Sequence, residues 1–296
     1  MCDLLLDKDL KFANNVLFII GNGFDLSHGI ESKYENFREY LDDIGKYNLL
    51  NLVNSFFDTS GTLWSDFEST LGKYDTETIL EECRPDESID FDHYMQSTAA
   101  IEDSPISFLK PTLEELKTEF SNWVNSIPLN GIDPIFKKLS PSSWYLTFNY
   151  LETLEAIYHI PRDHVFHIHG SRIDHGDYIF GHCNLQENPY GYDEDLPHYE
   201  EEARANIVDI MNEYVKQYEY NINQCQLFHI DLQRIAKIVV VGHSLSMSDW
   251  PYFIEIKKHL SPEVPWHISY HSRDEASSIE KKCLNLKISN YELFQI

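Results

Sequence analysis

The sequence has few basic residues and no long apolar run. Lys and Arg number 23 against 49 Asp and Glu, which gives a net charge of −26 at pH 7 over 296 residues. A surface this acidic repels phosphate backbones, so sequence-independent binding to DNA or RNA is not expected. A small anionic ligand remains compatible with the charge, because backbone dipoles can make a pocket locally positive.

Targeting segments and paired cysteines are also lacking. Residues 1–9 contain no basic stretch followed by a long apolar one, so we expect no secretory signal, and no apolar run reaches transmembrane length. The five cysteines are scattered and form no CxxC pair, which argues against a zinc ribbon or a thiol redox motif. We therefore predict a cytoplasmic protein with reduced thiols and no membrane association.

Six short apolar segments have the composition of buried strands, and helical segments separate several of them. Most are β-branched or aromatic and end in Gly, Asn or His, which is typical of inner strands of a parallel sheet. This alternation predicts an α/β fold with a mostly parallel sheet flanked by helices. The expected strands are Val16–Ile20, Trp144–Phe148, Val165–Ile168, Tyr178–Phe180, Ile238–Val241 and Trp266–Tyr270.

Two helical insertions interrupt this pattern, at residues 32–139 and 197–236. The core is then expected to consist of residues 1–31, 140–196 and 237–296. We expect the insertions to form a cap, where a lid, substrate specificity or a partner surface tends to lie. Helices are expected at 34–43, 49–57, 64–71, 113–127 and 200–218, with a polar, mobile stretch near 84–105.

The most informative motif, GNGFD at residues 21–25, directly follows the first expected strand. Its two glycines allow a tight turn and a close approach of the backbone to a ligand. A strand, a glycine loop and a helix in this order are the layout of a phosphate site. The third glycine of the usual dinucleotide fingerprint is replaced by Leu26. A simple turn in which Asp25 caps the next helix is an equally good interpretation.

Three further motifs follow expected strands: TFNY at 147–150, HIHG at 167–170 and GHSL at 242–245. Ligands of open α/β sheets bind at the carboxyl ends of the strands, so we expect the four loops to converge on one edge. The spacing of His167 and His169 would put both imidazoles on one face of their strand. GHSL is not a nucleophile elbow, because that motif needs glycine at Ser246.

Structural interpretations of these residues stay open. Asn149 can simply cap a helix expected at 151–157, which is the better interpretation when the residue is taken singly. Most of the six histidines between 159 and 182 can be hydrogen-bonded polar groups at the rim of the sheet. They lack a recognised ligand spacing, so no metal is expected.

Taken together, the motifs resemble the bacteriophage abortive-infection AbiH family over most of the chain. The segments that carry this resemblance are GNGFDLSHGI, LWSDFE, TFNY, HIHG and VVGHSL. A more distant resemblance links GNGFDLSHGI, TFN, HG and GHSL to the GAGxSxxxGI, TQN, HG and GTSL elements of sirtuin-type NAD-binding domains. These resemblances imply a Rossmann-like, sirtuin-like core, a role in antiviral defence, and NAD as substrate or ligand.

The sirtuin resemblance also implies roles for individual residues. Asn149 would orient the nicotinamide ribose and an attacking water, and His169 would act as a general base. Asp25 would bond a ribose hydroxyl. The diphosphate would lie on Gly21, Asn22 and Gly23, and the adenosine ribose on Gly242 and Ser244.

Departures from the sirtuin pattern narrow the expected chemistry. The acid of the TQN-x-D element is replaced by Leu151, and the nearest acid is Glu152, one place late. The Asp-Phe-Arg that follows the sirtuin loop is replaced by residues 32–34 (SKY). No zinc-binding CxxC pairs exist, which argues against protein deacetylation. Hydrolysis of the N-glycosidic bond of NAD is the simpler expectation.

Three functions are therefore weighed. The first is an antiphage NAD hydrolase, which must be restrained by a regulatory partner, homo-oligomerisation or a covering insertion. The second is a non-catalytic sensor or partner module that binds NAD or ADP-ribose, as the missing acid at Leu151 suggests. The third is a metal-dependent nuclease that uses the histidines with Asp66 and Glu68, although this spacing does not put both carboxylates on one helical face.

Overall fold

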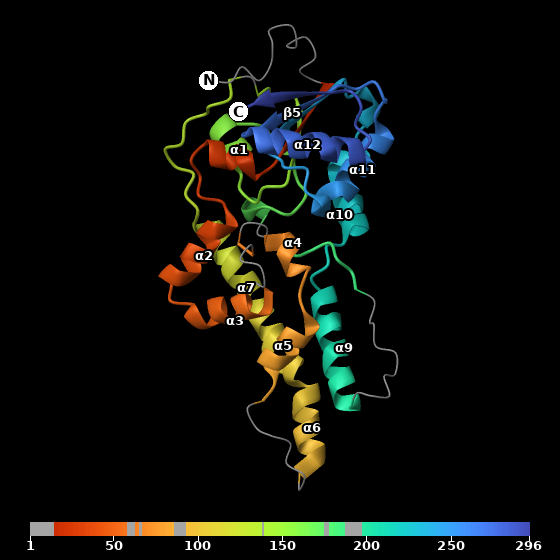
Figure 1. Ribbon diagram of the computed structural model, residues 1–296. Helices are drawn as coiled ribbons and strands as arrows, with labels where there is room; N and C mark the ends of the chain where they lie inside the picture. The colour runs from red at the N-terminus through yellow and green to blue at the C-terminus, as the bar shows by residue number, and fades with distance from the viewer. Residues whose placement is uncertain are drawn as a thin grey trace. The chain divides into compact units, whose positions relative to one another are not determined.

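The computed structural model describes residues 15–57, 63–64, 67–85, 93–137, 139–174, 178–186 and 197–296. The chain divides into two compact units. The sheet unit contains residues 1–33, 124–179 and 217–296, and the helical unit contains residues 34–123 and 180–216 (Figure 1). The helical unit therefore combines parts of both predicted insertions, with boundaries that differ from the predicted ones. Their arrangement as a cap stays a prediction.

The described part of the sheet unit contains one sheet of six parallel strands in the order β3-β2-β1-β4-β5-β6. Because β1 lies between β2 and β4, the strand order reverses direction at the β1/β4 pair, which is where open α/β sheets bind ligands. The strands are β1 (Val16–Ile20), β2 (Trp144–Thr147), β3 (Val165–His167), β4 (Lys237–Val241), β5 (Trp266–Tyr270) and β6 (Tyr291–Gln295).

Helices cover both faces of this sheet, because alternate residues of each strand point to opposite sides. In β1, Phe18 packs with α1 (Asn22–Ser27) and α8 (Thr153–Tyr158), whereas Leu17 and Ile19 belong to a second apolar cluster. That second cluster contains residues of α11 (Trp250–His259) and α12 (Arg273–Asn285), which Figure 1 shows in blue beside β5. The predicted α/β, Rossmann-like fold is thus confirmed.

One predicted strand was wrong, and one strand was missed. Tyr178–Phe180 is apolar and buried, but it forms no strand, and its Ile179 N–H donates to the carbonyl of His169. The sixth strand is instead β6, which pairs with β5 at the edge of the sheet. Its side chains are mostly half-exposed, so it lacks the continuous apolar run that marks the inner strands.

The helical unit is built around α7 (Ser104–Ser126), whose last residues continue into the sheet unit. Within this unit α9 (His198–Asn212) packs against α5 (Thr76–Cys83) and α6 (Tyr94–Glu102). The predicted mobile stretch therefore contains a helix, α6. The predicted helix at 113–127 begins earlier, at Ser104, and that at 200–218 ends at Asn212.

The remaining helices of the described residues are shorter. None of the described helices combines the length and apolar character that a membrane span requires. These helices are α2 (Tyr34–Asp43), α3 (Tyr47–Phe57), α4 (Phe67–Leu71), α10 (Tyr218–Gln224) and the 3-10 turns η3 (Arg162–His164), η4 (Arg172–Asp174), η5 (Gln226–His229), η6 (Leu232–Arg234) and η7 (Met247–Asp249).

Candidate functional site

The four motif segments meet at the carboxyl edge of the sheet, as predicted. Ile20 at the end of β1 is in register with Thr147 of β2 and Val241 of β4, and Thr147 is in register with His167 of β3. The loops that follow these strands therefore start side by side. This places Gly21, Asn149, His169 and Gly242 along one edge of the sheet unit.

The glycines of the first and fourth loops allow the two backbones to interlock. A Cβ on Gly21 would lie 2.6 Å from the Cα of His243, and one on Gly23 would lie 2.8 Å from the Cα of Gly242. Gly242 has φ +67°, and its Cβ would lie 2.1 Å from the Phe24 nitrogen. Only glycine fits such an approach. The glycine pattern is thus explained by loop-to-loop packing within the chain.

Hydrogen bonds reinforce this interlock. The Gly21 N–H donates to the Val241 carbonyl at 3.0 Å, and the Gly23 N–H donates to the Gly242 carbonyl at 2.8 Å. Two of the backbone donors expected to face a diphosphate are therefore used within the chain. The exposed Asn22 is bonded to Ser32 through both its amide atoms, at 2.8 and 2.6 Å. Ser32 is one of the residues that depart from the sirtuin pattern, so the departure has a structural role.

Asp25 lies inside α1 rather than at its start, so the interpretation as a helix cap was wrong. Gly21 occupies the cap position, and Asp25 is 1 % exposed. Neither carboxylate oxygen has a hydrogen-bond partner of acceptable distance and angle among the described residues. Burial raises the pKa of Asp25 to about 7, although the nearby Thr153 hydroxyl and Asn149 amide oppose the rise. An acid that titrates near neutrality is characteristic of functional sites.

Asn149 joins the second loop to the first. Its Nδ2 donates to the Gly21 carbonyl at 3.1 Å, which fixes the orientation of the amide and leaves Oδ1 as an acceptor. That Oδ1 is buried without a hydrogen-bond partner among the described residues, and so is the Thr153 hydroxyl. The alternative role as a cap of α8 was wrong, because Glu152 occupies the cap position.

Asp249 brings His169 and His243 together, a cluster that the sequence motifs did not reveal. Its Oδ1 lies 3.7 Å from Nε2 of His169, and its Oδ2 lies 3.3 Å from Nε2 of His243. All three residues are buried. The ring of Phe148 packs edge-on to both imidazoles, with centroid distances of 5.2 Å to His169 and 4.4 Å to His243.

His167 does not share the surroundings of His169. β3 ends at His167, so the alternation of a strand does not extend to His169, and the prediction of one common face was wrong. Nδ1 of His167 lies 3.0 Å from the Asn149 carbonyl, and its Nε2 lies 3.0 Å from Oε1 of Glu155. Because both ring nitrogens of His167 are hydrogen-bonded within the protein, a structural role accounts for this residue. His164 and His182 likewise bond to backbone carbonyls.

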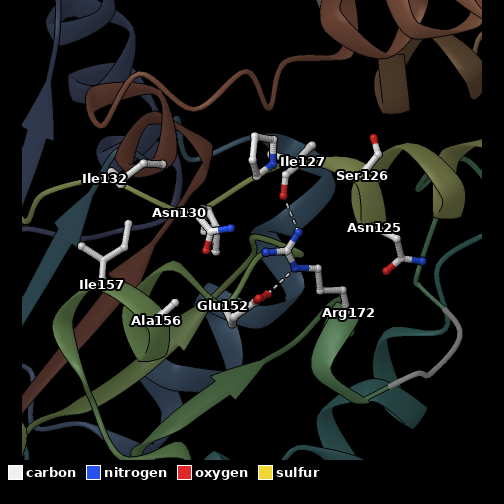
Figure 2. Close-up of a pocket in the computed structure, with 12 residues that line it drawn as sticks. Asn125, Ser126, Ile127, Asn130, Ile132, Glu152, Ala156, Ile157 and Arg172 are labelled. Atoms are coloured by element: carbon white, nitrogen blue, oxygen red, sulfur yellow. Dashed lines mark hydrogen bonds and ion pairs between the residues drawn. The ribbon is translucent and has the colours of Figure 1, made fainter.

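Ser244 and Glu152 have partners away from this cluster. Ser244 is exposed, and its carbonyl accepts from Lys282 Nζ at 2.8 Å. Glu152 accepts from Nε of Arg172 at 2.6 Å, and Arg172 also donates to the Ile127 carbonyl at the end of α7, as Figure 2 shows. The pair lines a pocket of about 530 Å³ together with residues 125–132 and α8. Glu152 therefore does not supply the acid that Leu151 lacks.

Comparison with known proteins identifies the family. The sequence profile described as bacteriophage abortive infection AbiH matches residues 17–270. This chain belongs to the AbiH family. No curated protein and no solved structure matches it significantly. The match covers the four edge motifs, so Gly21, Asn149, His169 and Gly242 all lie within the AbiH region.

The acids of the alternative nuclease site are only partly described in this AbiH chain. Asp66 lies outside the described residues. Glu68, in the helical unit, is bonded to Tyr34 and to the buried Lys216. Within the part of the chain that the structure describes, no group of three or more His, Cys, Asp or Glu side chains has the geometry to hold a metal ion.

Proposed function

We propose that this AbiH-family chain hydrolyses the N-glycosidic bond of NAD, or of a closely related nucleotide, during abortive infection. The observation that carries the proposal is a pair of buried acceptor groups on the motif edge of the sheet. Asn149 Oδ1 and the Asp25 carboxylate have no hydrogen-bond partner of acceptable distance and angle among the described residues. Buried polar atoms in a folded protein normally have partners. Ribose hydroxyls and a water molecule are donors that would satisfy both groups.

The proposed reaction needs a base and a held water at the edge of the sheet. His169 takes a proton from the water while the water oxygen bonds to C1′ of the nicotinamide ribose. The bond between C1′ and the nicotinamide nitrogen breaks, and its electron pair leaves with neutral nicotinamide. The products are ADP-ribose and nicotinamide, and the proton on His169 returns to solvent. Asn149 Oδ1 would orient the water or the ribose.

The test is nucleotide analysis in cells that produce the full chain, with and without phage infection. We expect wild type to lower NAD and to raise ADP-ribose and nicotinamide, as measured by mass spectrometry. Replacing Asn149 or His169 by Ala should reduce nicotinamide release by roughly 10²-fold or more. His229→Ala is the matched control, because His229 is exposed and bonds only a local carbonyl, that of Asn223. Unchanged NAD in infected wild-type cells would remove the catalytic proposal.

A non-catalytic nucleotide sensor is the second candidate. It is supported by Leu151 at the position of the missing acid and by the pairing of Glu152 with Arg172. A sensor would bind NAD or ADP-ribose saturably in calorimetry and would release no nicotinamide. In that case Asn149→Ala would weaken nucleotide binding. Cells that produce His169→Ala would contain the same amounts of NAD and nicotinamide as cells that produce wild type.

A hydrolase that destroys NAD has to be restrained until infection. The proposal therefore includes a regulatory protein partner or homo-oligomerisation of the chain. The net charge of −26 favours a basic partner surface. The chain would be purified from uninfected and from infected cells, and the native mass of the two samples would show whether its assembly state changes.

A further inference from the structure

We propose that Asp249 is a positioning residue, which holds the His169 ring in the tautomer that can act as a base. His243 holds the other oxygen of the same carboxylate. The kinetic consequence rests on the proposed hydrolase function, whereas the tautomer itself can be measured without any substrate.

The side chain of Asp249 does not cap a helix. It occupies the cap position of α11, where an aspartate side chain ordinarily accepts from the backbone of the first helical turn. Its side chain makes no such hydrogen bond. The carboxylate is buried instead and faces two imidazoles. A buried charge is costly unless it is paired, so the imidazoles are its natural partners.

A backbone hydrogen bond sets the tautomer of His243. The Leu245 N–H donates to Nδ1 of His243 at 2.9 Å, so Nδ1 is an acceptor and the proton of the neutral ring lies on Nε2. Leu245 is buried and has φ +52°, an uncommon conformation for a non-glycine residue. This local turn directs Nε2–H of His243 toward Asp249 Oδ2 and keeps that oxygen in place.

The His169 ring is oriented with its Nε2 toward the Asp249 carboxylate. Its Nε2 faces Asp249 Oδ1 at 3.7 Å, so a carboxylate favours the tautomer with the proton on Nε2. The basic lone pair then lies on Nδ1, which accepts the proton of the attacking water. When the ring becomes an imidazolium, the attraction to Asp249 strengthens and the contact shortens, as catalytic contacts do along a reaction.

Apolar and phenolic groups surround the rest of the cluster. His169 lies beside Asp249, Tyr150 and Tyr252, and the ring centroids of the two tyrosines are 6.3 and 5.8 Å from that of His169. The Tyr252 hydroxyl accepts from Asn221. This low-polarity setting strengthens the interaction between the carboxylate and the imidazole.

The experiment is ¹⁵N NMR of the histidine rings in the full chain at pH 8, without nucleotide. Wild type should show the proton on Nε2 in both His169 and His243. In Asp249→Asn the amide can donate to Nε2 of His169, so the proton should move to Nδ1, while His243 stays unchanged because Leu245 holds its Nδ1. His243 is thus an internal control in the same spectrum. Glu255→Gln, which removes a charge on α11, should change neither ring.

Steady-state kinetics supply the second measurement. Asp249→Asn should lower kcat for nicotinamide release by roughly 10²-fold or more, with KM changed only a few-fold, since the base is lost but the binding groups remain. A proton on Nδ1 of His169 in wild type would overturn the proposal, even if Asp249→Asn fails to fold. An unchanged His169 tautomer in a folded Asp249→Asn would overturn it as well. If the His169 tautomer changes as expected but wild type releases no nicotinamide, the positioning role of Asp249 is supported and the hydrolase function is refuted.

Discussion

Both units bury acidic or basic side chains, but they neutralise them differently. In the helical unit, Lys216 is fully buried with its Nζ 2.7 Å from Glu68, and Arg204 lies 2.6 Å from Glu77. In the sheet unit, Asp25 lies near a hydroxyl and an amide, and Asp249 faces two imidazoles. In the helical unit, Lys216 and Arg204 are thus paired with full opposite charges, while Asp25 and Asp249 at the sheet edge are not.

We interpret this difference as one between buried charges that stabilise the fold and buried groups that are available for chemistry. The Arg204 guanidinium holds the pKa of Glu77 below its usual range, so that pair stays charged at neutral pH. Among the described residues, no cation is hydrogen-bonded to Asp25, and burial raises its pKa to about 7. Its charge can therefore change with pH or with a ligand. Groups whose charge can change are the ones that chemistry requires, which is why we assign function to the sheet edge.

The largest expected effect tests the helical unit. Glu68→Gln would remove the carboxylate charge that lies 2.7 Å from the buried ammonium of Lys216, which should lower the free energy of unfolding by about 3–5 kcal/mol. Urea denaturation measures the loss. Lys110→Gln is the control, because Lys110 pairs with Glu213 at the surface and should cost less than about 1 kcal/mol. Equal losses in the two variants would break the comparison.

The next effect tests the buried acid of the sheet unit. The pKa of Asp25 rises from 3.8 to about 7 on folding, so the native state holds a proton that the unfolded state releases between those values. Wild type should therefore lose stability as the pH rises from 4 to 7, by on the order of 4 kcal/mol from this group. Asp25→Asn should remove this loss and be the more stable protein above pH 7.

Denaturation midpoints of Asp25→Asn and wild type across this pH range measure the difference. Asp163→Asn, at an exposed position, is the control and should follow the wild-type curve. A constant gap between Asp25→Asn and wild type at every pH would mean that Asp25 is charged throughout and that the two units do not differ in this respect.

The smallest effect tests how rigidly the edge loops are locked. Gly242 and Gly131 both have positive φ, so alanine should cost about 1–2 kcal/mol at either position. At Gly242 the new Cβ also meets the Phe24 nitrogen, which should add about 1–3 kcal/mol, whereas nothing lies within 4 Å at Gly131. Thermal unfolding compares the two variants. Similar losses would show that the β1 and β4 loops separate easily.

Strand prediction from this sequence worked where burial was continuous. β1 is apolar along its whole length and β4 is apolar from Ile238 to Val241, because both faces of these strands are covered by helices. β6 was missed because it is an edge strand whose side chains are half-exposed or exposed, and polar residues interrupt its apolar ones. Tyr178–Phe180 was overpredicted because burial alone does not make a strand, which also needs a neighbour with free backbone groups.

The residues of the candidate site were likewise predicted only in part. Asn149 and His169 could be found because each directly follows a strand, and strand ends meet at one edge of a parallel sheet. Asp249 follows no strand and is a common helix-cap residue, so nothing local distinguished it. The two roles of the glycines, close approach to a ligand or to another loop, look alike in the sequence because both need the same missing Cβ.

The sequence by itself determined the family, the acidic charge, the inner strands and the edge at which their loops meet. These depend on composition, local motifs and short-range periodicity, which each segment carries alone. The tertiary structure decided the strand order, the interlock of Gly21 and Gly242, and the neighbours of Asp25 and Asp249. These features depend on contacts between segments that are far apart in the sequence. The role of a buried charged side chain is set by the partner that it meets there.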